Sequence, residues 1–180
     1  STKMNLFDAF FLSSIGRTAG FNIQDTGALP FRAQFLMILL MFIGASPGGT
    51  GGGIKTTTFA IMCLSIWATL SGKKDIIVFK RRVPHDVIYK SLIIFLIMTV
   101  FLVVLTLLLE IMENHDVGRI LFEMTSALGT VGLSTGDGGN LSMSAKFTTP
   151  SKLLITAAMF FGRLGPITIG LAAALYPHNA

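Results

Sequence analysis

An uncharged apolar run, residues 91–109 (SLIIFLIMTVFLVVLTLLL), restricts the possible folds of this chain more than any other feature of its sequence. A helix rises about 1.5 Å per residue, so about 20 such residues cross a hydrocarbon core of about 30 Å. Only 13% of the 180 residues are charged, whereas soluble domains carry roughly 25%. The run therefore predicts a membrane-spanning helix, and the composition excludes an ordinary water-soluble domain.

Charge and cysteine content exclude two further classes of protein. The formal net charge is +5, and in membrane proteins an excess of Lys and Arg marks cytoplasmic loops. We therefore expect a lipid membrane, and no nucleic acid, as a partner. Cys63 is the one cysteine, so no disulfide forms within the chain. The sequence begins Ser-Thr-Lys without an initiator Met or a signal peptide, and we expect it to be a piece of a longer protein.

Two further apolar regions are long enough to span a bilayer. Residues 31–70 are about twice the needed length, but residues 44–53 (GASPGGTGGG) interrupt them. Proline lacks a backbone donor and each glycine costs a helix about 1 kcal/mol relative to alanine, so we predict a broken helix. Such a break is tolerated at membrane depth where it is buried in protein or lines a water-filled cavity, and we expect it to face a pore. Residues 153–175 form the other predicted span.

Two shorter apolar segments, residues 4–15 and 117–128, are predicted to be half-membrane helices. Each has about 12 residues, which gives roughly 18 Å of helix and crosses about half a bilayer. Residues 73–90 hold six Lys and Arg and are expected in the cytoplasm, whereas the acidic residues 110–116 are expected outside. Both half-helices would then enter the membrane from outside and return there.

The sequence repeats itself at a fixed offset of 112 residues. Residues 10–21 align with residues 122–133, so that Ser14 corresponds to Ser126, Thr18 to Thr130 and Gly20 to Gly132. Each copy reads as a short helix, a glycine-containing strand, a turn and a long helix. Such self-similarity is typical of a fold built from repeated modules.

The repeat predicts a division of the chain into three parts. Residues 1–72 form a pore repeat that lacks its first helix and contains a pore helix, a filter and a broken helix with a glycine loop. Residues 73–90 form the basic cytoplasmic loop. Residues 91–180 form a complete pore repeat, with a helix, a pore helix, a filter and a helix that carries Arg163.

A short helix, a re-entrant loop and a spanning helix together make the pore module of potassium channels. An extended Thr-Val-Gly run can direct successive backbone carbonyls at the pore axis and replace the water shell of an ion. Glycine there permits torsions closed to other residues, and the negative C-terminal end of the short helix favours a cation. The alternative is a pair of interfacial segments with glycine turns. The predicted filter, with K+ at its carbonyls, comprises Thr18, Ala19, Gly20, Phe21, Asn22, Thr130, Val131, Gly132, Leu133 and Ser134.

On these residues the sequence resembles the Trk/Ktr/HKT superfamily of potassium transporters, and most closely the bacterial Ktr membrane subunit. The resemblance extends over nearly the whole chain and is carried by residues 16–22 (GRTAGFN), 48–57 (GGTGGGIKTT), 130–136 (TVGLSTG) and 162–166 (GRLGP). It implies an all-α membrane protein with four pore repeats around one pseudo-fourfold, potassium-channel-like pore, of which this chain is the third and fourth. Only the first glycine of the channel pattern Thr-Val-Gly-Tyr-Gly persists in each filter, which implies a looser filter than in tetrameric channels.

The resemblance also implies partners and a location. The partners would be the N-terminal half with the first two pore repeats, a second copy of the subunit in a homodimer, and a cytoplasmic nucleotide-binding regulatory ring of the RCK type. Residues 73–90 are the candidate docking loop, although attraction to anionic lipid explains the same charges. The location would be the plasma membrane, as a multi-pass protein of the bacterial inner membrane.

The glycine run between the two halves of the broken helix is a candidate gate. A phosphate-binding loop requires Gly directly before Lys, but Ile54 separates Gly53 from Lys55 and membrane helix flanks both sides. The remaining alternatives are a close-packing kink and a flexible gate below the filter, and the resemblance favours the gate. Its predicted residues are Gly48, Gly49, Thr50, Gly51, Gly52 and Gly53.

Arg163 is a charge in the middle of a predicted span. Such a residue costs about 2.5 kcal/mol or more and usually faces the bundle interior or water. The resemblance implies that it projects toward the pore beneath the filter, where it would oppose cations or pair with gate carbonyls. Snorkelling to the interface is the alternative.

Asp25 and Asp137 follow the two filters at matching positions. Together they fit an acidic outer mouth that concentrates cations. Ordinary turn-forming residues beside glycine would explain the same pattern.

These features predict potassium uptake through a selectivity filter gated by an intramembrane glycine loop, with Na+ as a further candidate ion and no covalent cofactor. No grouping of nucleophile, base and oxyanion donors is found, so an enzyme is not expected. The alternative is a membrane-embedded pump or assembly subunit with a pore-like architecture and no independent conduction.

Overall fold

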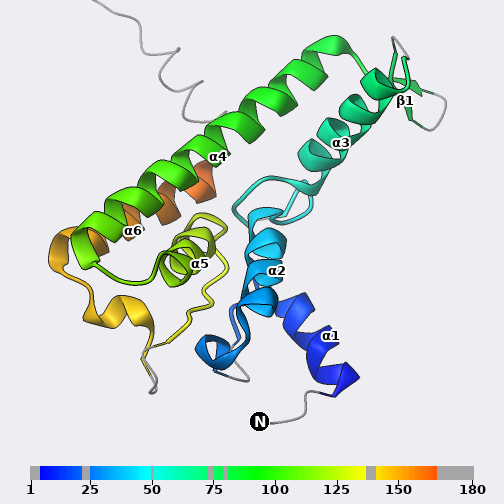
Figure 1. The fold of residues 1–180 in the computed structure, drawn as a ribbon. Coiled ribbons are helices and arrows are strands. Elements are labelled where there is room, and N and C mark those ends of the chain that lie inside the picture. Colours follow the sequence, from blue (N-terminus) through cyan, green and yellow to red (C-terminus); the bar gives the residue numbers. More distant parts are fainter. Residues whose placement is uncertain are drawn as a thin grey trace, which may run out of the picture.

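The computed structural model describes residues 5–21, 25–49, 51–72, 75–78, 81–136 and 141–165. Their regular elements are helices, apart from two short strands that pair antiparallel with Ile77 opposite Arg82 (Figure 1). In chain order they are α1 (Leu6–Ile15), the 3-10 turn η1 (Thr26–Ala28), α2 (Phe31–Phe42), α3 (Thr56–Leu70), β1 (Ile77–Val78), β2 (Arg81–Arg82), α4 (His85–Glu113), α5 (Val117–Leu128), the 3-10 turn η2 (Met143–Lys146) and α6 (Thr149–Leu164).

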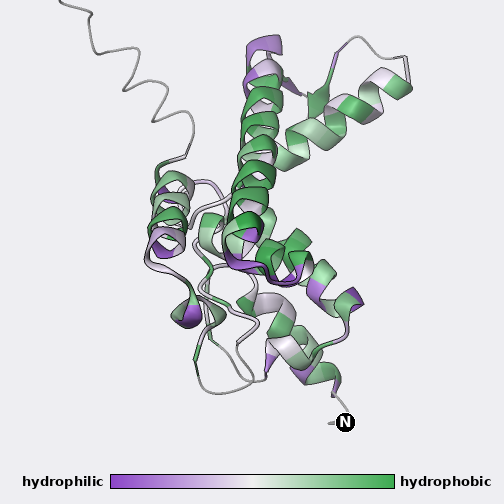
Figure 2. Ribbon diagram, turned by 60° about the vertical axis from the view of Figure 1, so that its left-hand side comes forward, coloured by the Kyte–Doolittle hydropathy of each residue, from purple (hydrophilic) through white to green (hydrophobic). Residues whose placement is uncertain are grey.

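The predicted spanning helix over residues 91–109 lies within α4. With 29 residues α4 is, within the described ranges, the one helix long and apolar enough to cross a membrane. Figure 2 shows hydrophobic residues along most of its length. Met98 and Leu109 on one face are fully buried, whereas Leu96 and Val103 on the other are at least half exposed. Such an apolar outer face fits contact with lipid.

Helix caps set ends that the hydropathy pattern did not predict. Pro84 is the N-cap of α4, so the last six residues of the predicted loop 73–90 are helical. The predicted helix over residues 153–175 begins four residues earlier, at Thr149, and α6 ends at Leu164. Gly165 is its C-cap, with a φ of 74° that residues with a side chain rarely adopt. Residues beyond Gly165 lie outside the described part of the chain.

The predicted break in residues 31–70 is confirmed, since α2 ends at Phe42 and α3 begins at Thr56. The half-membrane helix predicted over residues 117–128 is α5, with the same bounds. Asp116 caps its first turn by accepting from the Arg119 amide.

Helix α5 occupies the centre of the fold, where it packs against α2, α4 and α6 (Figure 1). Ile120, Met124 and Leu128 of α5 enter one core cluster with residues of α4 and α6. Phe122 enters a second cluster with residues of α1 and α2. Helix α5, which precedes the second predicted filter segment, is therefore packed on both sides.

Candidate functional site

The two predicted filter segments follow α1 and α5 and share one backbone pattern. Thr18 and Gly20 have φ values of 65° and 67°, and Thr130 and Gly132 have 52° and 89°. A positive φ is uncommon for threonine, yet it recurs at both threonines. The sequence repeat is thus also a repeat of backbone torsions, with positive φ at alternate residues.

The two segments meet at their glycines. A Cβ atom on Gly20 would lie 2.6 Å from the carbonyl oxygen of Val131, and one on Gly132 would lie 3.7 Å from the Cα atom of Gly20. The first distance is too short for any side chain. The fold therefore brings two segments 112 residues apart into backbone contact.

The second segment is anchored by its amides and side chains. The Val131 N–H donates to the Ser126 carbonyl oxygen at 2.9 Å. The side chains of Val131 and Leu133 are buried in the cluster formed with α1 and α2. In the described part of the chain the carbonyl oxygens of residues 130–133 accept no hydrogen bond. Of these oxygens, that of Val131 packs against Gly20. They lie near the C-terminal end of α5, where the helix dipole is negative.

Ser134 differs from the four residues before it, because its carbonyl oxygen accepts a hydrogen bond from the Thr26 hydroxyl. Thr26 is fully buried in η1. Gln34 on α2 fixes that turn by donating to the Thr26 carbonyl oxygen at 3.1 Å. The Ser134 end of the second predicted filter segment is thus tied to the turn that follows the first.

The first segment is the more open of the two. Ala19 is exposed, and Phe21 keeps 69% of its surface exposed. Asn22, which was predicted to end this filter, lies outside the described residues.

The glycine loop is closed at its neck by the ends of α2 and α3. Ile43 and Ile54 form a parallel bridge, with the Gly44 N–H donating to the Ile54 carbonyl oxygen at 2.8 Å. A Cβ atom on Gly53, whose φ is 76°, would lie 3.3 Å from the Gly44 Cα atom. The two ends of the loop are thus in contact, and the loop extends from a narrow neck between α2 and α3. Thr50 lies outside the described residues.

The loop packs against the threonines of both filters. The Gly52 N–H donates to the Thr130 hydroxyl oxygen at 2.8 Å. A Cβ atom on Gly51 would lie 2.8 Å from the Thr18 Cγ2 atom. Loop and filters are consequently in direct contact at the threonine end of both segments.

Lys55 holds the loop in place, a role that the sequence did not predict. Its Nζ donates to the carbonyl oxygens of Gly49, at 3.2 Å, and Gly51, at 2.6 Å. The available signal was a lysine beside a glycine run at predicted membrane depth, where a charge requires partners.

Arg163 is exposed near the C-terminal end of α6. Its neighbour Gly162 approaches the loop, since a Cβ atom on Gly52 would lie 3.0 Å from the Gly162 carbonyl oxygen. The backbone at Arg163 is therefore next to the loop. No hydrogen bond or ion pair of its side chain is found among the described residues.

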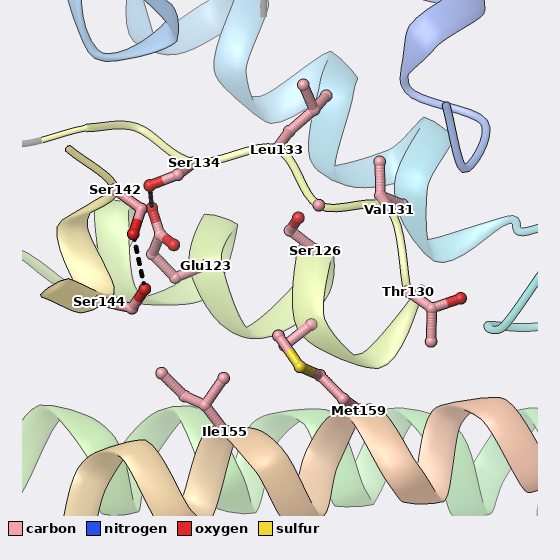
Figure 3. Close-up of a pocket in the computed structure, with 12 residues that line it drawn as sticks. Glu123, Ser126, Thr130, Val131, Leu133, Ser134, Ser142, Ser144, Ile155 and Met159 are labelled. Atoms are coloured by element: carbon pink, nitrogen blue, oxygen red, sulfur yellow. Dashed lines mark hydrogen bonds between the residues drawn. The ribbon is translucent and has the colours of Figure 1, made fainter. Parts of the chain in front are cut away.

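A cavity of about 400 Å³ lies between the second filter, α5 and α6 (Figure 3). Thr130, Gly132 and Ser134 line it from the filter, and Ile155 and Met159 line it from α6. Its carboxylate, Glu123 on α5, was also missed from the sequence. A charge within an apolar half-helix was the signal that could have found it.

Asp25 caps η1, because its Oδ1 accepts from the Gly27 N–H at 2.9 Å. That contact is the turn-forming role considered as an alternative to an acidic mouth. Its predicted counterpart, Asp137, lies outside the described residues.

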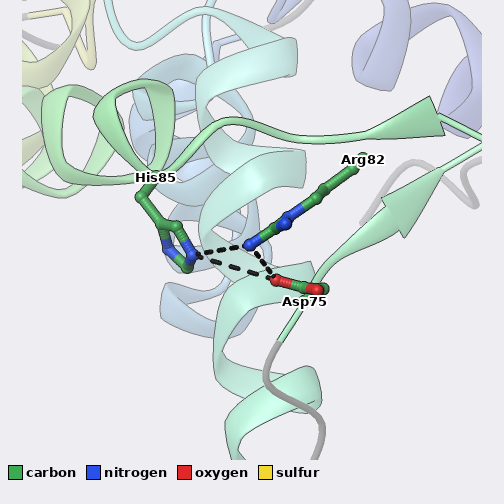
Figure 4. Close-up of polar contacts among 3 residues, drawn as sticks. All are labelled: Asp75, Arg82 and His85. Carbon is green, nitrogen blue, oxygen red and sulfur yellow. Dashed lines mark hydrogen bonds and ion pairs between the residues drawn. The ribbon is translucent and has the colours of Figure 1, made fainter.

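The basic segment includes a small polar cluster before α4 (Figure 4). Arg82 forms an ion pair with Asp75 at 2.6 Å, and His85 lies 3.8 Å from the same carboxylate. Arg81 beside them is exposed. The segment thus presents positive charge at one end of the long helix.

Comparison with known proteins gives a consistent set of similarities. Residues 2–180 match the family model described as TrkH, cation transport protein. The chain is 38% identical to the Ktr system potassium uptake protein B of Vibrio alginolyticus over 166 residues, and 38% identical to that of Bacillus subtilis (strain 168) over 164. These alignments cover 92% and 91% of this chain but 35% of each relative. The chain therefore spans about a third of the length of these relatives.

Among solved structures, the potassium transporter TrkH from Vibrio parahaemolyticus is similar, with a TM-score of 0.75 and 24% identity. The match covers 95% of this chain and 37% of that one. This likeness confirms the predicted fold class, a helical membrane protein with pore loops.

Proposed function

This chain belongs to the TrkH family of cation transport proteins, and we propose that it forms half of a pore through which K+ enters the cell. The family consists of membrane transporters and not of enzymes. One observation carries the proposal: two filter segments with the same torsions approach each other within backbone contact at Gly20 and Gly132. Two such segments supply half of a ring of carbonyl oxygens.

In the proposed mechanism the filter replaces the water shell of the ion. K+ exchanges hydration oxygens for backbone carbonyls of residues 18–22 and 130–134, and a ring of dipoles of fixed number and spacing discriminates between ions. The carbonyls of residues 130–133, which accept no hydrogen bond from the described residues, support this role. The Thr18 and Thr130 hydroxyls would add oxygens at the inner end. Na+ is the second candidate ion.

Residues 48–53 are proposed to gate this path. With its Gly52 amide on the Thr130 hydroxyl, the loop occupies the inner end of the filter, where it blocks an ion and competes for the same oxygen. Opening requires that this hydrogen bond and those of Lys55 break. Because a neutral hydrogen bond contributes about 1 kcal/mol and one to a charged group about 2 kcal/mol, a few such bonds are a barrier that a regulator can overcome.

Arg163 is proposed to raise the barrier to cations below the filter. Its helix end lies beside the loop at Gly52, and a guanidinium in a low-dielectric passage repels a cation. The charge also offers donors to loop carbonyls, which would favour the closed state.

The complete pore is proposed to need a further half of the protein, because the two filter segments of this chain surround only half of the pore axis. We assign residues 1–72 to the third pore repeat without its first helix, residues 73–90 to a cytoplasmic loop and residues 91–180 to the fourth repeat. The missing partner is an N-terminal half with the first two repeats. A homodimer of such subunits would lie in the bacterial plasma membrane on a nucleotide-binding ring of the RCK type, with residues 73–90 as the docking loop.

Uptake of radioactive Rb+ into liposomes that contain the four-repeat protein tests the function. We expect uptake that unlabelled K+ inhibits and that proceeds without ATP. Absence of uptake would favour an assembly subunit without conduction, and strict dependence on ATP hydrolysis would favour a pump subunit.

Two variants test the gate and the barrier separately. Deletion of glycines around Gly51 should raise the Rb+ flux, because the shortened loop no longer reaches Thr130. Arg163→Gln should also raise the flux by removing the repulsion. Unchanged flux in either purified variant would remove that residue or loop from the proposed path.

A further inference from the structure

Glu123 is a buried carboxylate that the proposed conduction path does not use. It lies in the middle of α5, and 7% of its surface is exposed. Burial of a carboxylate is costly unless donors surround it. Its position directly behind a filter segment therefore calls for a specific reason.

The donors that satisfy Glu123 come from the outer end of the second filter. Its Oε1 accepts from the Ser134 hydroxyl at 2.6 Å, the Thr135 N–H at 2.8 Å and the Thr135 hydroxyl at 3.1 Å. Figure 3 shows the side chain reaching from α5 toward Ser134. Hydrogen bonds to a charged acceptor are shorter and stronger than neutral ones. The carboxylate thus fixes both a side chain and the backbone at this end of the filter.

The Ser134 hydroxyl extends this anchor to the returning chain. Its oxygen accepts from the N–H groups of Gly136, at 3.1 Å, and Met143, at 3.0 Å. One carboxylate and one hydroxyl therefore organise the backbone on both sides of the segment that leaves the filter. Removal of the carboxylate would leave Ser134 and Thr135 without their shared acceptor.

The first repeat has an apolar residue where the second has Glu123. At the offset of 112 residues Phe11 corresponds to Glu123, and Phe11 packs against the apolar cluster of α1 and α2. The two repeats thus differ at this position, with a buried carboxylate in the second and an apolar side chain in the first.

We propose that Glu123 is a positioning residue that holds the outer end of the second filter in place and thereby maintains the preference for K+ over Na+. This inference rests on the proposed function of residues 130–134 as an ion filter. A carbonyl ring discriminates between ions only while its oxygens keep their spacing. The carbonyls of residues 131–133 lie directly before Ser134 and Thr135, and their spacing depends on how these two residues are held.

The test measures selectivity and not activity alone. Four-repeat protein in liposomes takes up radioactive Rb+, and the concentrations of K+ and of Na+ that halve this uptake give a K+/Na+ ratio. For Glu123→Met, which has no carboxylate acceptor, we expect the ratio to fall about tenfold or more, since the loss of three hydrogen bonds is sufficient for that change. Glu123→Gln keeps an acceptor oxygen and should retain most of the ratio.

Glu113 provides the matched control. Its Oε1 accepts from the N–H and the hydroxyl of Thr148, at 2.8 and 2.7 Å, so it makes the same type of anchor at the start of α6. Glu113→Met should leave the K+/Na+ ratio within twofold of wild type, even where its thermal stability falls.

Two results separate this inference from the proposed function. Wild-type protein without Rb+ uptake would overturn both. Uptake in wild type together with an unchanged ratio in Glu123→Met would overturn the positioning role alone. If the Glu123→Met protein cannot be produced in folded form, Ser134→Ala is measured in its place. This substitution removes the shortest of the three hydrogen bonds and leaves α5 unaltered. An unchanged ratio in Ser134→Ala then overturns the inference.

Discussion

Replacement of Gly162 by alanine should separate α6 from α5, although alanine is the better helix former. A Cβ atom on Gly162 would lie 2.7 Å from the Leu128 carbonyl carbon, 3.0 Å from the Leu128 Cα atom and closer still to the carbonyl oxygen. Ordinary carbon contacts lie near 3.5 Å, so the first distance is about 0.8 Å short. All three atoms belong to the backbone and cannot rotate away. The two helices must therefore move apart.

The expected cost follows from two opposing effects. Overpacking costs about 3 kcal/mol where backbones must move, and alanine regains about 1 kcal/mol of helix propensity. The net loss of about 2 kcal/mol corresponds to a fall in Tm of about 4–8 °C. Thermal unfolding of the detergent-solubilised protein, followed by loss of the monodisperse peak in size-exclusion chromatography, measures this change.

Gly16→Ala is the matched control for this substitution. Gly16 follows α1 as its cap in the right-handed helical region. A Cβ atom there would meet its nearest neighbour, the Ser13 carbonyl oxygen, at 3.6 Å. That distance is ordinary contact, so we expect a change in stability within about 0.5 kcal/mol. A Gly162→Ala protein as stable as wild type, or more stable, would refute the reasoning from close helix contact.

Three further substitutions test separate contacts. Gly20→Ala should abolish Rb+ uptake, because its methyl group would lie 2.6 Å from the Val131 carbonyl oxygen at a φ of 67°; substantial uptake would contradict the backbone contact of the filters. Lys55→Met should raise the Rb+ flux in liposomes, because two hydrogen bonds to loop carbonyls are lost; equal or lower flux would argue against a restraint on the loop. Asp75→Asn should change the free energy of unfolding by less than about 1 kcal/mol, because both side chains of the ion pair with Arg82 are more than a third exposed to solvent; a larger loss in thermal unfolding would contradict this estimate.

Helices were the most predictable part of the fold. The bounds of α5 agree with the apolar segment 117–128, and the glycine run was identified as a break between α2 and α3. These features depend on local properties: apolar side chains enter the membrane, and proline and glycine end helices. The ends of α4 and α6 were not predicted, because Pro84 and Gly165 act as caps. A cap depends on backbone conformation, which a hydropathy pattern does not contain.

The sequence paired residues of the candidate site but did not identify the side chains that support them. The repeat at an offset of 112 identified Thr18 and Thr130 as a pair, and both have a positive φ. Neither Lys55 nor Glu123 was recognised, because the value of a buried charge depends on donors and acceptors that come from other segments. Glu123 is satisfied by residues 11 and 12 positions away, across a turn whose path the sequence does not specify.

The sequence by itself determined that this chain lies in a membrane, that glycine breaks the apolar region over residues 31–70 and that two copies of one module follow each other. Each of these properties is encoded in neighbouring residues, through hydropathy, backbone torsions and internal similarity. Only the tertiary structure decided that Gly20 contacts Val131 and that the Gly52 N–H donates a hydrogen bond to the hydroxyl oxygen of Thr130, 78 residues away. Contacts over such separations arise because α2 and α6 pack on α5, and that packing brings loop and filters to one place.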